Sequence, residues 1–163
     1  DALISKTWKE QIRLAERHNQ PGKFTTFIGW EWSSLPGGAN LHRVVFTTAD
    51  GAQAEKFMPF GSDISADPQD LWRWLDKTSE AIDGEFIAIP HNSNISKGFM
   101  FDSVTLKGEQ LTAESERQRI KWEPVAEITQ LKGDSETLSI FSPDDEFADF
   151  ETYSFYIQQM KEP

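Results

Sequence analysis

Apolar residues recur with the spacing of an α-helix in several parts of the chain. Near the N-terminus they occupy positions 4, 8, 12 and 15, and the pair Pro21-Gly22 ends the pattern. A second pattern follows Asp67-Pro68, where Asp suits a helix cap and Pro suits the first helical position. We predict helices over residues 3–19, 70–82, 112–122 and 150–160.

Shorter runs of apolar, aromatic and β-branched residues predict strands over residues 24–32, 41–48, 85–90 and 124–130. The run at 85–90 is almost continuously apolar, which is typical of a strand buried in a parallel sheet. Because helices and strands alternate, the sequence favours an α/β fold with a mainly parallel sheet. An open doubly wound sheet and part of a (β/α) barrel both fit this order.

Polar residues interrupt three of the strand-like runs. Glu31 lies between two tryptophans, and a carboxylate buried there would need a partner because desolvation costs several kcal/mol. That partner is either a bound cation or a buried arginine such as Arg43. His42 begins one run and His91 ends another. One Glu and two His at strand ends, where ligands bind in α/β folds, predict a partial metal site.

Other polar residues have weaker claims to a functional role. Asn92 follows His91 and offers a neutral hydrogen-bonding group. Glu127 lies within the strand predicted at 124–130, where a solvated face and a functional role are both possible. Lys132, in the polar stretch that follows, is either a substrate contact at the same rim or part of a solvated loop. His18 lies at a helix end, where the helix dipole favours a cation.

Composition narrows the classes of partner. The chain has 163 residues, enough for one domain or for an internal fragment of a larger one, and we expect a fragment. A net charge of −11 argues against nucleic acid and anionic membranes as partners. No apolar run reaches the roughly 18 residues of a membrane span, so we expect a soluble protein of the cytoplasm or periplasm. Without cysteine, only histidine, carboxylates and water remain as metal ligands.

Several blocks of the sequence together resemble one bacterial family, catalogued as domain of unknown function 3604. These blocks are FTTFIGWEW (24–32), GGANLHR (37–43), DLW (70–72), IPHNSN (89–94), WEP (122–124) and QLKGDSE (130–136). That family is similar to the PHP (polymerase and histidinol phosphatase) metallohydrolases. The resemblance implies a distorted, TIM-like (β/α) barrel of the PHP domain type with two or three zinc, manganese or iron ions. It also implies hydrolysis of phosphate or related sulfate or phosphonate esters.

The resemblance assigns roles to particular residues. Glu31, His42 and His91 correspond to metal ligands of the PHP proteins. The His-x-His and Asp-x-His motifs of those enzymes are absent from this chain, which is a further reason to expect a fragment.

The leading hypothesis is therefore a metal-dependent phosphoesterase, or related hydrolase, of a small anionic ester, in which Arg43 and Asn92 act as catalytic residues that orient the substrate. Its oligomeric state is left open. Two alternatives stay open, a catalytically inactive scaffold and a carbohydrate- or peptide-binding module that uses Trp30, Trp32, Trp72 and Trp74 as a platform.

Overall fold

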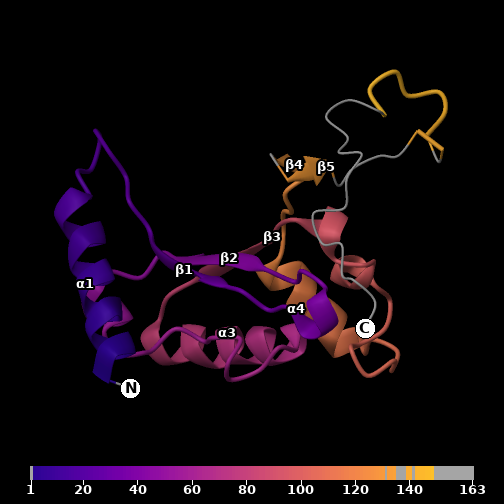
Figure 1. Cartoon of the computed structure of the whole chain (residues 1–163). Coiled ribbons are helices and arrows are strands. Elements are labelled where there is room, and N and C mark those ends of the chain that lie inside the picture. The colour runs from indigo at the N-terminus through magenta and orange to yellow at the C-terminus, as the bar shows by residue number, and fades with distance from the viewer. Residues whose placement is uncertain (1, 131, 135–138, 141, 149–163) are drawn as a thin grey trace.

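The computed structural model describes residues 2–130, 132–134, 139–140 and 142–148 and has a mixed α/β fold (Figure 1). The longer elements are α1 (Ala2–His18), β1 (Ile28–Trp32), β2 (Arg43–Thr47), α3 (Pro68–Ile82), β3 (Phe86–Pro90) and α4 (Ala113–Trp122). The shorter ones are α2 (Gly51–Ala54), β4 (Thr129–Gln130), β5 (Gly133–Asp134) and single 3-10 turns at Pro36–Gly38, Ser93–Ile95 and Phe99–Phe101. No helix in this described part combines the length and apolar character that crossing a bilayer requires.

Three of the predicted helices are confirmed, together with the predicted cap of α3. The Asp67 side chain accepts a hydrogen bond from the Gln69 amide at 2.9 Å, and Pro68 is the first residue of α3. At the start of α4, the Thr112 hydroxyl accepts from the Ser115 amide at 3.1 Å. The helix predicted at 150–160 lies outside the described residues. The strand predicted at 124–130 is wrong except for β4, which pairs only with β5.

The predicted mainly parallel sheet, and with it the PHP-type barrel, is wrong. The sheet has three strands in the order β1-β2-β3, is open at both edges, and pairs antiparallel throughout. The β1–β2 connection, residues 33–42, is too short for the crossover that parallel neighbours need. It turns at Gly37 and Gly38, whose φ angles of 55° and 77° suit glycine.

The β2–β3 connection explains why helix-strand alternation was misleading. Residues 48–85 include α2 and α3, yet the chain returns to the end of the sheet that it left, where Thr47 pairs with Phe86. The Thr48 amide donates to the Glu85 carbonyl at 3.0 Å and so closes this excursion. The helices therefore lie within a long antiparallel hairpin, not within a crossover.

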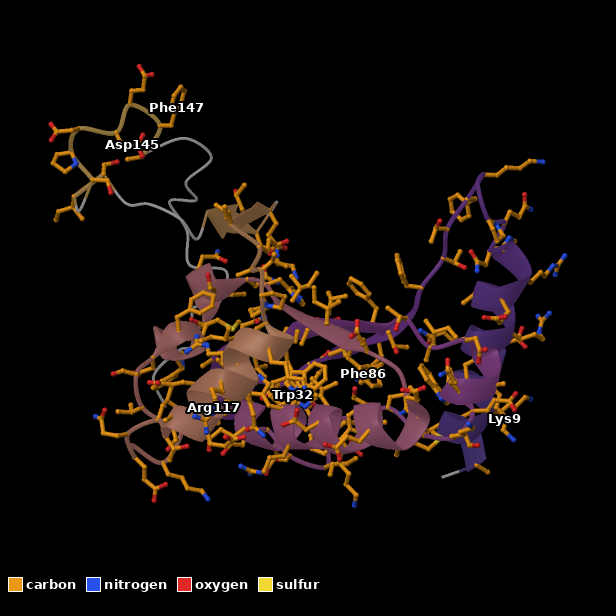
Figure 2. The ribbon with its side chains drawn as sticks, turned by 180° about the vertical axis from the view of Figure 1, so that it is seen from behind. Lys9, Trp32, Phe86, Arg117, Asp145 and Phe147 are labelled. Atoms are coloured by element: carbon orange, nitrogen blue, oxygen red, sulfur yellow. The ribbon has the colours of Figure 1, made fainter. Side chains whose placement is uncertain are left out.

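The core lies on one face of the sheet. Figure 1 shows α3 running along this face, and Figure 2 shows Trp32 and Phe86 between the sheet and the helix. Both side chains belong to a buried cluster with Leu71, Leu75 and Trp122 of the helices. A second, smaller cluster packs α1 beside β1 through Trp8 and Ile12. The opposite sheet face carries exposed or half-buried side chains and has no covering layer among the described residues.

Candidate metal centre

Glu31, His42 and His91 come together at one end of the sheet, where β1 and β3 finish and β2 begins. Glu31 is the penultimate residue of β1, His42 immediately precedes β2, and His91 immediately follows β3. Because β2 runs antiparallel to both neighbours, its beginning lies beside their ends. The His91 amide donates to the His42 carbonyl at 3.2 Å, which extends the β2–β3 ladder by one more pair.

Strand alternation puts these three side chains on one face. Glu31 pairs with Val44, and Val44 pairs with Ile89, so His42 and His91 lie two residues from members of this row. Side chains two residues apart in a strand share a face. The three site residues therefore project from the face opposite α3.

The sequence-based expectation of a buried Glu31 is wrong. The two flanking tryptophans face the core side, and the Glu31 side chain between them is 47% exposed. Alternation is the physical reason, since neighbouring residues in a strand point to opposite faces. Glu31 therefore needs no buried counter-charge, and any role in binding cations must be argued from its contacts.

The Glu31 carboxylate contacts both imidazoles through the same oxygen. Its Oε1 lies 2.8 Å from His42 Nδ1 and 3.2 Å from His91 Nε2. The two rings are nearly perpendicular, with centroids 5.7 Å apart and an interplanar angle of 70°. One donor atom from each residue lies within 4.8 Å of the other two. Such convergence of three donors from three strands is what a metal centre requires.

The protonation state of His42 suits a ligand. Burial lowers the pKa of His42, and the nearby His91 and Lys132 also lower it, while the Glu31 carboxylate opposes this shift. A histidine must be neutral to coordinate a metal, so a lowered pKa keeps its lone pair available near pH 7.

His91 and Asn92 carry buried polar atoms without hydrogen-bond partners in the described part of the chain. These atoms are Nδ1 of His91 and both side-chain amide atoms of Asn92, which is 1% exposed. A metal-bound histidine normally donates its second ring nitrogen to an acceptor, and the described residues provide none for His91. The catalytic role of Asn92 stays a prediction.

Arg43 lies away from the carboxylate of Glu31. Its side chain faces the core, is 1% exposed, and pairs with Glu123 at 2.9 Å from Nε to Oε1. Glu123 also accepts from the Trp72 indole at 2.6 Å. The alternative in which Arg43 pairs with Glu31 is therefore wrong, because alternation turns Arg43 away from the face that carries His42. Arg43 joins β2 to α4, and we do not propose it as a substrate contact.

The tryptophans do not form the exposed platform that a carbohydrate-binding module would use. Trp32 and Trp72 are buried. Trp30 and Trp74 are half-buried and pack edge to face, with centroids 5.6 Å apart. This arrangement is typical of an aromatic core.

Fold and site together define a mixed α/β protein with a two-histidine, one-carboxylate candidate metal centre on an open sheet. The comparisons with curated proteins and with solved structures found no match. The family described as "Protein of unknown function (DUF3604)" matches residues 1–163. The chain therefore belongs to the DUF3604 family.

Proposed function

We propose that Glu31, His42 and His91 bind a divalent zinc, manganese or iron ion as part of a metal-dependent hydrolase. The observation that carries this proposal is the convergence of their three donor atoms within 4.8 Å. Two imidazoles and one carboxylate form the donor set of several catalytic zinc sites and of non-haem iron sites. Three protein ligands leave further positions for water or substrate.

Two of the three donor separations are close to those around one ion. Ligand atoms around a tetrahedral zinc lie roughly 3.3 Å apart, given bond lengths of about 2.0–2.2 Å. The Glu31 oxygen lies 2.8 Å and 3.2 Å from the two imidazole nitrogens. The donor atoms as a group lie within 4.8 Å of one another, so binding one ion would need the two imidazoles to turn toward each other and the exposed Glu31 side chain to move slightly outward.

We propose small anionic phosphate, sulfate or phosphonate esters as substrates. A bound divalent ion would lower the pKa of a coordinated water and offset negative charge that develops on the ester. In the chain itself, His42, His91 and the Glu31 carboxylate would hold the ion. The positive charge of Lys132, which contributes to the lowered pKa of His42, would favour the anionic group, although the chain as a whole is acidic.

Metal content and hydrolysis of the full-length protein test this proposal. We expect zinc, manganese or iron in the purified protein by elemental analysis, and hydrolysis of nitrophenyl phosphate mono- or diesters or of nitrophenyl sulfate. Glu31→Ala, His42→Ala and His91→Ala should each lose metal and activity. His18→Ala is the matched control, because His18 is an exposed histidine at the end of α1.

Two results would contradict the proposal. The first is a wild-type protein that contains no metal and takes up none, which would favour an inactive scaffold. The second is metal uptake that His91→Ala leaves unchanged, which would place the metal at other residues.

A further inference from the structure

Glu127 contacts the backbone on both sides of His91. Its amide donates to the Pro90 carbonyl at 2.9 Å, and its Oε2 accepts from the Asn92 amide at 3.1 Å. Glu127 comes from the segment after α4, so these bonds join a separate part of the chain to the end of β3.

A third backbone bond completes the fixation of this segment. The His91 amide donates to the His42 carbonyl, so residues 90, 91 and 92 each make a hydrogen bond to another part of the chain. Asn92 has a left-handed backbone conformation with φ of 60°, which costs free energy for a residue other than glycine. A charged acceptor on its amide offsets part of that cost, because hydrogen bonds to ionised groups are stronger than neutral ones.

The Glu127 carboxylate itself is not among the three converging donors. Its Oε2 is occupied by the Asn92 amide and by the side-chain amide of Gln130. The described group of potential metal ligands consists of Glu31, His42 and His91 alone. The hydrogen bonds of Glu127 to the backbone therefore connect it to the candidate metal site through the residues on either side of His91.

We infer that Glu127 is a positioning residue that fixes the backbone around His91 and thereby aims its imidazole at Glu31. This inference rests on the proposed metal site and adds a residue to it. Outer-shell partners of metal ligands typically change metal affinity by about 10–100-fold when they are removed. We expect a loss of that size when the acceptor oxygen of residue 127 is withdrawn.

Two conservative variants separate positioning from charge. Glu127→Gln keeps an oxygen at the same reach and removes the charge, whereas Glu127→Asp keeps the charge and shortens the reach. Co²⁺ titration of the full-length protein, followed by visible absorption, should show near wild-type affinity for Glu127→Gln. Glu127→Asp and Glu127→Ala should bind about 10–100-fold more weakly. Glu109→Ala, at an exposed carboxylate, is the control.

The inference would be overturned if Glu127→Gln bound Co²⁺ more weakly than Glu127→Asp. It would also be overturned if Glu127→Asp and Glu127→Ala both kept the Co²⁺ affinity of the wild type. A metal-free measurement separates this outcome from failure of the proposed function. In long-range ¹H–¹⁵N spectra, the His91 ring signals should move in Glu127→Asp and stay in place in Glu127→Gln. If they move while the wild type binds no Co²⁺, the positioning role stands and the metal site fails. If they stay in place in Glu127→Asp, the positioning role is refuted.

Discussion

Removing Glu123 should strongly destabilise the protein, because this carboxylate is buried and neutralises Arg43. The Glu123 side chain is 2% exposed and that of Arg43 is 1% exposed. After Glu123→Leu, the hydrogen bond that Arg43 would keep among the described residues is the one from Nη1 to the Leu41 carbonyl, at 2.6 Å. The Trp72 indole would also lose its acceptor.

The magnitude follows from the burial of this pair. Removing one partner of a buried ion pair costs about 3–5 kcal/mol, because the other charge stays uncompensated. A urea slope of about 2 kcal/mol per molar then predicts an unfolding midpoint lower by roughly 2 M. Replacing both members by apolar residues should recover the part of this loss that comes from the uncompensated charge of Arg43. The Trp72 indole and Arg119 would still lack the Glu123 carboxylate, so recovery should be partial.

Urea unfolding followed by tryptophan fluorescence measures both effects, with Arg43→Met/Glu123→Leu as the matched double variant. We also expect the double variant to bind Co²⁺ like the wild type, because Arg43 faces away from the Glu31 face. A loss below about 1 kcal/mol in Glu123→Leu would show that the pair is not desolvated as the structure has it. A double variant as unstable as the single one would refute the argument from uncompensated charge.

Three further predictions concern stability and use the same unfolding measurement. Gly29→Ala should cost about 1–3 kcal/mol, because an added Cβ would lie 2.5 Å from the Val45 carbonyl oxygen; an unchanged midpoint would contradict this close approach. Thr112→Ala removes the cap of α4 and should cost about 0.5–2 kcal/mol, whereas Thr25→Ala in an exposed segment should not. The Ser65 hydroxyl and Arg73 lower the pKa of Asp70 below its ordinary 3.8. Asp70 therefore stabilises the fold above that pH and loses this effect as the pH falls through its lowered pKa. Because the group is partly exposed, Asp70→Asn should lower the free energy of unfolding by less than about 1 kcal/mol at pH 7. The difference in stability between Asp70→Asn and the wild type should vanish in acid.

The helices could be predicted because their signals are local. Caps at Asp67 and Thr112 and the apolar stripe of α1 depend on residues within a few positions of one another. Strand direction is different, since it depends on where the chain returns after a connection. Residues 48–85 have the helix content of a crossover, and the hairpin shows in contacts between the two ends of this segment, such as the pairing of Thr47 with Phe86 and the bond between Thr48 and Glu85.

The sequence identified the candidate ligands but misjudged their surroundings. Glu31, His42 and His91 stood out as polar interruptions of apolar runs, and the structure brings them together. Strict alternation along β2 would already have separated Arg43 from His42, because neighbouring residues point to opposite faces. The partners Glu123 and Glu127 lie far along the chain from Arg43 and His91, so no local pattern could have paired them.

The antiparallel sheet explains why a rule for parallel sheets placed Glu31 and His91 at the same end of the sheet. β1 and β3 both run antiparallel to β2 and therefore parallel to each other. Glu31 and His91, near the ends of these two strands, consequently lie at the same end of the sheet. The third donor comes from the residue before β2, because a reversed strand begins where its neighbours end. The face of the sheet on which a side chain lies also changes with each residue, since Arg43, one residue beyond His42, lies in the core. The donor set therefore depends on strand register, and a shift of β2 by one residue would turn His42 into the core and separate it from Glu31.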